Sequence, residues 1–281
     1  MSATLINGET TTCIPVSDRA FQYGDGVFET IRISRRTPTL WSLHLKRLLA
    51  GCQYLGIPVD ARLIEAELFQ LLATNPSDGI AKLLISRGSG GRGYQPPAVT
   101  EPLRIAQFYP LPAELDLRRD SGIRTRLCSH PISRNGSLTR FKHLCRLDQV
   151  IASGELSEAF PEGIMLTEDE QVIEGTRSNL FLVSGGELVT PSLQEAGIHG
   201  VMREYLINRF AGGDVSVNEV KQEIVSLETL RSASELFFCN SVFGIWPVTE
   251  LQLVDGPIPY AIGPFAQRAG EFVDDAFVLE N

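Results

Sequence analysis

The chain has 281 residues, of which 43% are hydrophobic and 21% are charged, and its formal net charge is −9. These proportions are those of an ordinary globular protein, and the length suits one large domain or two of average size. The negative charge argues against a nucleic-acid partner, because phosphates would repel such a surface. No stretch approaches the roughly 20 apolar residues of a membrane span, and no basic segment precedes an apolar run at the N-terminus.

Cysteines, histidines and serines exclude several kinds of site. The five cysteines are scattered and form no C-x-x-C pair, which is typical of buried thiols in a reducing compartment. We therefore expect a cytoplasmic protein without a membrane partner. The four histidines show no metal-ligand spacing such as H-E-x-x-H, so we expect no metal site. A serine hydrolase is excluded because the chain has no G-x-S-x-G motif.

The first part of the chain alternates strand and helix signals. V-F-E-T-I-R-I alternates apolar and polar residues as a half-buried strand does, and leucines at helical spacing follow it. The predicted elements are a strand over 27–33, helices over 42–55 and 60–74, and strands over 81–86 and 103–109. They predict a small α/β domain over residues 1–110.

The segment Y-P-L-P-A-E-L-D-L-R-R-D-S-G contains two prolines, a run of charges and a final glycine, which predicts an interdomain linker over 111–122. Beyond it the predicted strands are short and frequent. They cover 123–129, 164–167, 171–174, 178–183, 187–190, 215–220 and 235–239, with helices over 143–153, 201–210 and 226–231. This pattern favours a larger, mixed, barrel-like domain over 123–281 rather than a doubly wound parallel sheet. The predicted fold class is α/β with a mixed α+β character.

Lys142 stands apart among only four lysines. It lies in L-T-R-F-K-H-L-C-R-L, between Phe141 and Leu144, at the start of the predicted helix. Apolar neighbours destabilise an ammonium group and make a lysine nucleophilic, as a lysine that forms a Schiff base must be. On local sequence alone, a lysine whose ammonium reaches solvent past the helix end is the better interpretation.

Glu174 is the carboxylate with the most suggestive position. It ends one apolar strand, and Ser178 and Asn179 open the next. A carboxylate held at such a turn can pair with a protonated pyridine nitrogen, which strengthens the ring as an electron sink. A glutamate that only caps the turn fits the local sequence equally well.

Two segments could bind a phosphate. In E-A-G-I-H-G-V-M-R, Gly197 and Gly200 permit a close approach of the backbone, and a helix start offers N–H groups to an anion. Asn240 and Ser241, directly after the strand E-L-F-F-C, offer small polar groups. Arg47 could add a charge-assisted hydrogen bond, although an arginine on a surface helix is the alternative.

The glycine-rich stretch S-R-G-S-G-G-R-G-Y (86–94) does not predict a nucleotide site. It lacks the lysine and serine or threonine of a P-loop, and its glycines do not follow G-x-G-x-x-G. Arg87, Arg92 and Tyr94 on a flexible loop suit the capture of a substrate carboxylate. A plain flexible hairpin is the alternative.

Taken together, five motifs in chain order resemble the fold-type IV pyridoxal-phosphate family, which includes branched-chain and D-amino acid aminotransferases and 4-amino-4-deoxychorismate lyases. The resemblance covers nearly the full chain. The motifs are S-D-R-A-F-Q-Y-G-D-G-V-F-E-T (17–30), H-x-x-R-L from His44, F-K-H-L-C-R-L around Lys142, E-G-T-R-S-N-L-F from Glu174 and G-I-H-G-V-M-R from Gly197.

The resemblance implies a two-domain homodimer with the cofactor, pyridoxal 5′-phosphate, in the cleft between the domains. It makes Lys142 the Schiff-base lysine and Glu174 the partner of the pyridine nitrogen. The implied phosphate-binding groups are Arg47, the backbone of Ile198 and His199, and Asn240 with Ser241. His199 departs from the threonine that is common in the aminotransferases, which matters only if a side-chain hydroxyl contacts the phosphate.

Within the family, the chain is most similar to the 4-amino-4-deoxychorismate lyases. The similarity rests on I-S-R-G-S-G-G-R-G-Y, on K-H-L-x-R-L-x-Q-V, and on Thr30 in place of a glycine. It implies formation of 4-aminobenzoate and pyruvate in folate biosynthesis, with Lys142 as general base, Thr30 as a donor to the leaving group, and Arg87, Arg92 and Tyr94 at the small-molecule substrate. An aminotransferase of D- or branched-chain amino acids is the main alternative, and a cofactor-free binding protein of the same fold is another.

Overall fold

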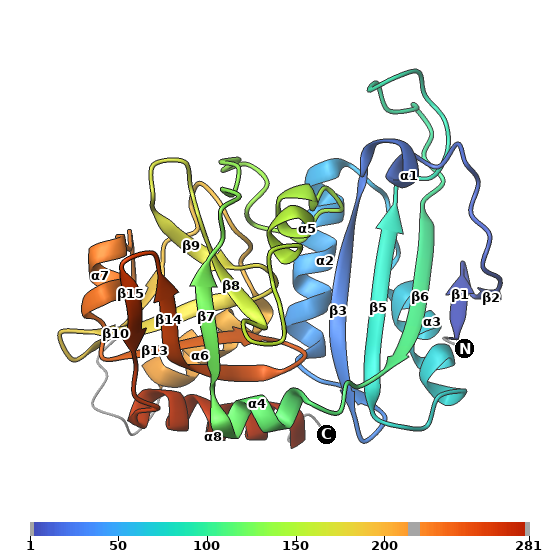
Figure 1. The fold of residues 1–281 in the computed structure, drawn as a ribbon. Coiled ribbons are helices and arrows are strands. Elements are labelled where there is room, and N and C mark those ends of the chain that lie inside the picture. The colour runs from blue at the N-terminus through green and yellow to red at the C-terminus, as the bar shows by residue number, and fades with distance from the viewer. Residues whose placement is uncertain (1–2, 213–219, 279–281) are drawn as a thin grey trace. The chain divides into compact units, whose positions relative to one another are not determined.

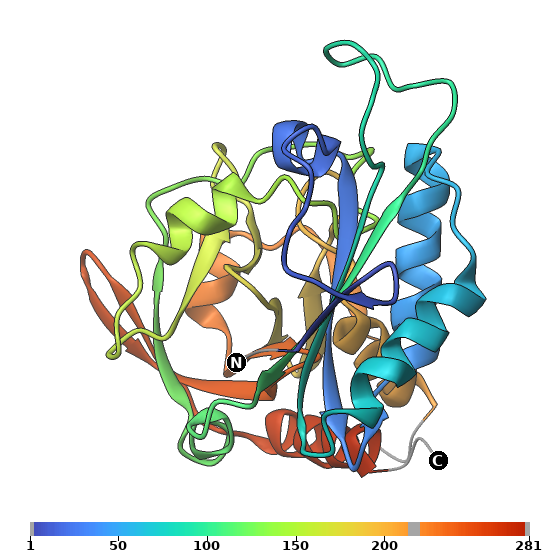
Figure 2. The ribbon, with the colours of Figure 1, turned by 90° about the vertical axis from the view of Figure 1, so that its right-hand side faces the viewer.

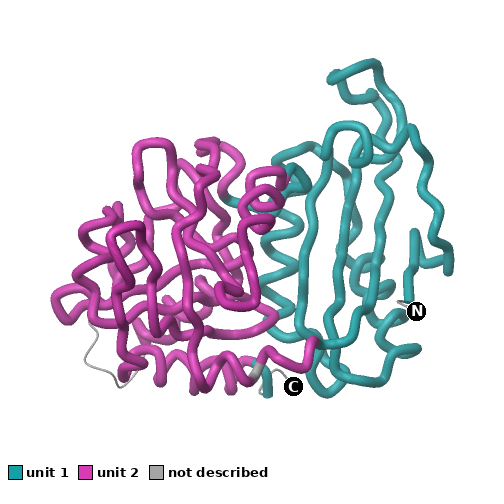
Figure 3. Tube along the Cα trace, in the orientation of Figure 1, with its two compact units in different colours: residues 1–111, 140–145, 277–281 teal, residues 112–139, 146–276 magenta. Residues whose placement is uncertain are grey.

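The computed structural model of the chain describes residues 3–212 and 220–278 (Figure 1). The chain forms two compact units (Figure 3). Unit 1 comprises Met1–Leu111, Arg140–Cys145 and Phe277–Asn281, and unit 2 comprises Pro112–Thr139 and Arg146–Ala276. No helix among the described residues is long and apolar enough to cross a bilayer.

Unit 1 is built on one antiparallel sheet. Its described elements are β1 (Thr4–Ile6), β2 (Glu9–Thr10), α1 (Arg19–Tyr23), β3 (Gly26–Ser34), β4 (Thr37–Pro38), α2 (Trp41–Leu55), α3 (Ala61–Ala73), β5 (Gly79–Ser86) and β6 (Leu103–Pro110). The strand order within these residues is β2-β1-β6-β5-β3-β4. Helices α2 and α3 cover the same face of this sheet (Figure 2).

Strand β3 separates two chemically different faces. Side chains alternate across a strand, so Val27, Glu29 and Ile31 share one side and Phe28 and Thr30 the other. The first three are at most 1% exposed and lie on the face covered by α2. The second face is only half-buried.

Unit 2 is a larger mixed domain. Its described elements are α4 (Leu115–Ser121), β7 (Ile123–Leu127), α5 (Leu147–Ser153), β8 (Glu162–Leu166), β9 (Val172–Gly175), β10 (Asn179–Ser184), β11 (Glu187–Pro191), α6 (Val201–Ala211), β12 (Lys221–Glu223), α7 (Leu227–Ser232), β13 (Glu235–Asn240), β14 (Gly244–Leu253), β15 (Gly256–Pro259) and α8 (Pro264–Val278). The strand order is β12-β11-β10-β13-β14-β7-β8-β9, with β15 beside β14. The sheet curls so that β9 also lies against β10, which makes a half-barrel and confirms the predicted mixed, barrel-like fold.

The predicted helix over 143–153 is wrong in its first turn. Helix α5 begins only at Leu147, because the preceding residues pair with β3 instead. The N–H of Phe28 donates to the carbonyl of Lys142 (2.8 Å), and the N–H of Leu144 donates to the carbonyl of Gly26 (3.0 Å). Lys142 therefore lies on an extended segment of unit 1, not at a helix entry.

The stretch 111–122 also differs from the predicted linker. It contains α4, whose first residue, Leu115, is buried and accepts a hydrogen bond from Trp246 Nε1 at 3.2 Å. The prolines and charges of this stretch thus precede and decorate a helix that packs within unit 2. The predicted strand over 215–220 lies almost wholly outside the described residues, and β14, β15 and α8 were not predicted.

Candidate active site

Lys142 and Thr30 belong to the half-buried face of β3. The Nζ atom of Lys142 lies 4.6 Å from the centroid of the Phe28 ring, and Nζ of Lys82 lies 5.5 Å from the same ring. Thr30 is directly opposite Lys82 in the register of β3 and β5. An ammonium group over an aromatic face is attracted by the ring quadrupole, which orients it without an ion pair. Unit 1 therefore gathers a hydroxyl and two amines around one aromatic ring.

The opposite face of β3 carries a buried ionic cluster. Glu29, 1% exposed, accepts hydrogen bonds from Arg47 Nε (2.7 Å) and Nη2 (2.5 Å) and is 2.6 Å from His44 Nδ1. Arg47 and His44 come from neighbouring positions of α2. Arg47, predicted to bind phosphate, is thus held edge-on by a carboxylate, a fork geometry that fixes its guanidinium plane.

The protonation states of this cluster follow from its burial. Burial opposes ionisation of Glu29, but the charge of Arg47 and the hydrogen bond from His44 lower its pKa to about 2. Burial lowers the pKa of His44 below its ordinary value, although Glu29 pulls in the other direction. His44 is consequently neutral at pH 7 with its proton on Nδ1. Its Nε2 is buried and has no hydrogen-bond partner within the described residues.

Glu174 lies on β9 of unit 2 and is 3% exposed. Its Oε2 accepts from the backbone N–H of Ile198 (2.8 Å) and from Nδ2 of Asn179 (3.4 Å), and its Oε1 is 3.5 Å from Nε2 of Gln149. These donors are neutral, so they satisfy the carboxylate without cancelling its charge. A charge kept in this way is what a protonated ring nitrogen requires.

The loop from Gly197 to Gly200 leads into α6 with little free space. The N–H groups of Ile198 and His199, predicted to bind phosphate, donate to Glu174 and to the carbonyl of Thr139 (3.2 Å). They therefore shape the loop within unit 2. Gly200 is the N-cap residue of α6 and supplies no side-chain cap, so the first-turn N–H groups of this 11-residue helix form an anion site by geometry.

Asn240 and Ser241 lie at the turn that follows β13. The Oδ1 of Asn240 accepts from the N–H groups of Val242 and Phe243 (2.9 Å each), and its Nδ2 donates to the carbonyl of Arg177 (3.1 Å). The amide of Asn240 therefore shapes the turn. The half-buried Ser241 offers its hydroxyl beside it.

The glycine-rich stretch contains two very different arginines. Arg87 is 6% exposed, and its guanidinium donates to both carboxylate oxygens of Asp25 (2.7 and 3.0 Å) and to the carbonyl of Leu55 (2.7 Å). This placement gives Arg87 a structural role, and we do not carry it forward as a substrate-binding residue. Arg92 and Tyr94 are exposed, Tyr94 by 87%.

Two residues of these networks were not predicted to matter. Asn179 bridges Glu174 and the carbonyl of Ile198 (2.9 Å) and is 6% exposed. Glu29 holds Arg47. The available signals were weak: a buried amide at the first position of an apolar strand, and an acidic residue on the apolar side of V-F-E-T-I-R-I.

Comparison with known proteins identifies the family. The family model described as amino-transferase class IV matches residues 26–251. The chain belongs to this family. A crystal structure of 4-amino-4-deoxychorismate lyase from Pseudomonas aeruginosa matches with a TM-score of 0.91 and 38% identity, over 99% of this chain and 100% of that one. Aminodeoxychorismate lyase from Vibrio harveyi is 32% identical over 94% of this chain and 96% of its own length.

Aminotransferases are also among the relatives. D-alanine aminotransferase from Bacillus licheniformis is 25% identical over 99% of this chain and 98% of its own length. The lyases and aminotransferases of this family depend on pyridoxal 5′-phosphate, which is therefore the cofactor of this chain. This cofactor presents three groups to a protein: an aldehyde, a ring nitrogen and a phosphate. The amine of Lys142, the carboxylate of Glu174 and the start of α6 match these groups in chemistry.

Proposed function

We propose that this protein is a pyridoxal-phosphate-dependent lyase that converts 4-amino-4-deoxychorismate to 4-aminobenzoate and pyruvate, a step of folate biosynthesis. The observation that carries the proposal is the end-to-end likeness to the lyase from Pseudomonas aeruginosa, at 38% identity and a TM-score of 0.91. Two further lyases, from Vibrio harveyi and Bacillus subtilis, are 32% and 33% identical to this chain.

The residues that would hold the cofactor come from both units. Lys142 would bond to its aldehyde carbon, and Glu174 would accept the N–H of its ring. Arg47, the loop at Ile198 and His199, and the turn at Asn240 and Ser241 would surround its phosphate. Bound in this way, pyridoxal phosphate supplies a ring that stabilises negative charge on the carbon next to the substrate nitrogen.

The chain's own residues would do the remaining work. Once the amine of Lys142 is displaced by the substrate amine, it can take the proton from the carbon that bears nitrogen. The hydroxyl of Thr30, on the same face of β3, can donate a hydrogen bond to the enolpyruvyl oxygen as its bond to the ring breaks. The exposed Arg92 and Tyr94 can hold a substrate carboxylate. The elimination is strongly downhill because it leaves an aromatic ring.

An aminotransferase is the second candidate. Relatives named as D-alanine and branched-chain-amino-acid aminotransferases match 85% or more of this chain at 25–29% identity. Both reactions begin with removal of a proton from the carbon that bears nitrogen, so Lys142 and Glu174 would serve either. The two activities differ only in whether an oxygen substituent can leave the substrate ring.

Direct assay of the purified, cofactor-loaded protein tests the proposal. We expect 4-amino-4-deoxychorismate to yield equal amounts of 4-aminobenzoate and pyruvate. D-alanine or a branched-chain amino acid with 2-oxoglutarate should yield glutamate at a far lower rate. Rapid glutamate formation without 4-aminobenzoate would establish the aminotransferase instead. Absence of a visible cofactor band after added pyridoxal phosphate would favour a cofactor-free binding protein.

We further propose that the protein works as a homodimer in the cytoplasm. The proposal for the dimer follows the family resemblance and is tested by light scattering at micromolar concentration. The cytoplasmic location is supported by the state of the five cysteines, which are all free thiols, three of them buried.

A further inference from the structure

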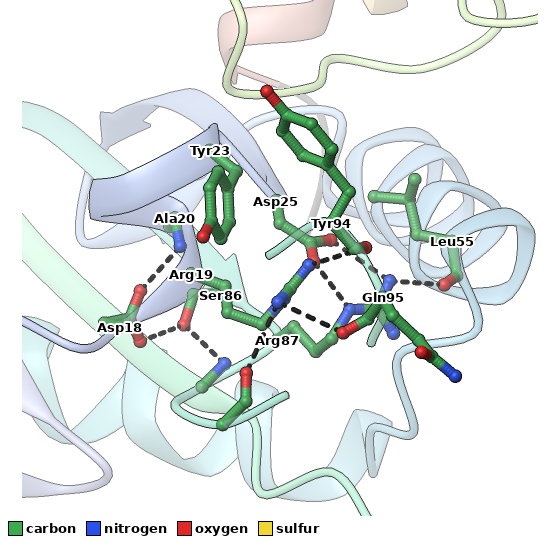
Figure 4. Close-up of polar contacts among 12 residues, drawn as sticks. Asp18, Arg19, Ala20, Tyr23, Asp25, Leu55, Ser86, Arg87, Tyr94 and Gln95 are labelled. Carbon is green, nitrogen blue, oxygen red and sulfur yellow. Dashed lines mark hydrogen bonds and ion pairs between the residues drawn. The ribbon is translucent and has the colours of Figure 1, made fainter. Parts of the chain in front are cut away.

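Arg19 is enclosed by the glycine-rich stretch (Figure 4). It belongs to α1, is 3% exposed and pairs through Nε with Asp25 (2.8 Å). Its remaining guanidinium nitrogens face backbone carbonyls of residues 88–95, which we call the glycine-rich loop. The printed distances are 3.3 Å to Gly90, 3.0 Å to Gly93, 3.1 Å to Tyr94 and 3.5 Å to Gln95. One buried cation thus gathers four carbonyl groups of one loop.

The start of the loop is also tied to α1. Asp18 caps α1 by accepting from the N–H of Ala20 (2.8 Å), and it accepts from the hydroxyl of Ser86 (2.6 Å). That hydroxyl in turn accepts the N–H of Gly88 (2.9 Å), and the N–H of Arg19 donates to the carbonyl of Gly88 (2.9 Å). The loop is therefore anchored at its entry and folded around the Arg19 side chain.

This arrangement explains why the stretch is rich in glycine. Gly91 has a φ of +80°, and a Cβ atom there would lie 2.4 Å from the carbonyl oxygen of Gln95 and 3.2 Å from Nη1 of Arg19. Gly88 has a φ of +84°, and its Cβ would lie 2.0 Å from the carbonyl oxygen of Glu101. Only glycine permits these backbone conformations and approaches at little cost. The glycines serve to converge carbonyls on a guanidinium group.

The side chains of the loop remain on the outside. Tyr94 points away from the cluster in Figure 4, and its ring is 5.5 Å from that of Tyr23. Arg92 is exposed, and within the described residues its guanidinium makes no hydrogen bond or ion pair. The loop therefore has a fixed backbone and two uncommitted, substrate-type side chains.

We propose that Arg19 is a positioning residue that holds the glycine-rich loop in its binding conformation before substrate arrives. The inference rests on the proposed function, in which Arg92 and Tyr94 hold a substrate carboxylate. A loop that is already ordered does not lose conformational freedom on binding, so its order appears as affinity rather than as chemical rate. Arg19 lies under the loop and touches neither substrate nor cofactor.

Replacement of Arg19 by alanine, followed by chemical rescue, tests this inference. In the cofactor-loaded Arg19→Ala protein we expect KM to rise about tenfold or more while kcat changes less than about threefold. Amide hydrogen exchange of residues 88–95 should become faster. Methylguanidinium at millimolar concentration should restore both the KM and the exchange protection, because it can fill the carbonyl cage. Urea, which is neutral, should restore neither.

Two control variants complete the design. Arg62→Ala removes an exposed arginine of α3 and should change neither KM nor exchange. Arg92→Ala should raise KM but leave the exchange of the loop unchanged and should not respond in the exchange assay to methylguanidinium. An unchanged KM in Arg19→Ala, or a fall in kcat alone, would overturn the inference. Failure of the proposed lyase function is separately visible, because the wild type would then form no 4-aminobenzoate, and the KM comparison would be made with the amino acid that it does turn over.

Discussion

The two units bury their polar groups in opposite ways. In unit 1, carboxylates are paired with cations: Glu29 with Arg47, and Asp25 with Arg19 and Arg87. In unit 2, the carboxylate of Glu174 is held by an amide side chain and a backbone N–H. A paired charge is neutralised and serves structure, whereas a charge held by neutral donors remains available to a ligand. The comparison predicts that buried acids of unit 1 set stability and that Glu174 sets chemistry.

The largest effect is expected within unit 1, between two lysines that share an aromatic ring. Lys142→Ala should lower turnover by at least about 10³-fold, because the residue both anchors the cofactor and moves the proton. Lys82→Ala, whose ammonium lies over the same Phe28 ring, should stay within about tenfold of the wild type. Borohydride reduction and peptide mapping should place the pyridoxyl group on Lys142. Labelling of Lys82 would contradict the assignment.

Glu29→Gln should produce the largest loss of stability. It leaves the guanidinium of Arg47 buried without its counter-charge, which costs about 3 kcal/mol or more. Glu67→Gln is the matched control, since Glu67 pairs with Arg104 (2.7 Å) at a more exposed site of unit 1 and should cost about 1 kcal/mol. Urea unfolding monitored by circular dichroism measures both. Equal losses would show that burial of the Glu29 pair does not matter.

The same residue predicts an acid-sensitive wild type. The pKa of Glu29 is lowered to about 2 in the folded chain, so the unfolded chain binds more protons and stability falls with pH. The contribution of Glu29 is complete above its ordinary pKa of 4.5 and is lost as pH falls toward about 2. The lowered pKa of His44 acts in the same direction, because its partners Glu29, Arg47 and Lys142 leave it neutral when folded. Glu29→Gln should flatten this acid limb of the stability curve.

Glu174→Gln tests the other half of the comparison. The amide can still accept the hydrogen bond from Ile198, so stability should change by less than about 1 kcal/mol. Without a negative charge beside the ring nitrogen, turnover should fall by about 100-fold, with a shift of the visible cofactor band. A stability loss as large as that of Glu29→Gln, with normal turnover, would reverse the roles assigned to the two acids.

Much of the site chemistry could be predicted from the sequence, because local motifs mark it. Lys142, Glu174 and the loop before α6 each stand in a distinctive run of residues, and their order along the chain indicates the family. The conformation around Lys142 could not be predicted, because the apolar spacing of F-K-H-L fits a helix. The pairing of Lys142 and Leu144 with β3 decides it instead, and that pairing joins segments more than 100 residues apart.

The roles of the arginines were equally hidden. Arg87 and Arg92 are both found in S-R-G-S-G-G-R-G-Y, yet one is buried against Asp25 and the other is exposed. Asp25 and Arg19 precede this stretch by about 60 to 75 residues, so no local pattern reveals which arginine they engage. The fold class was accessible for the opposite reason: the alternation of short strands and turns is a local property of the chain.

The smallest predicted effect concerns the two ends of α6 and asks how tightly the neutral network of unit 2 is packed. A Cβ atom at Gly200 would lie 1.9 Å from Oδ1 of Asn179, which bridges Glu174 and Ile198. Gly200→Ala should therefore cost about 1–3 kcal/mol and weaken the affinity for pyridoxal phosphate. Gly212→Ala, at the other end of the helix, meets its nearest atom at 3.5 Å and should change stability by less than about 0.5 kcal/mol. Urea unfolding and cofactor titration measure both variants. If they behave alike, the close packing of Asn179 against Gly200 does not hold the phosphate loop, and the neutral network of unit 2 is more tolerant than the ionic clusters of unit 1.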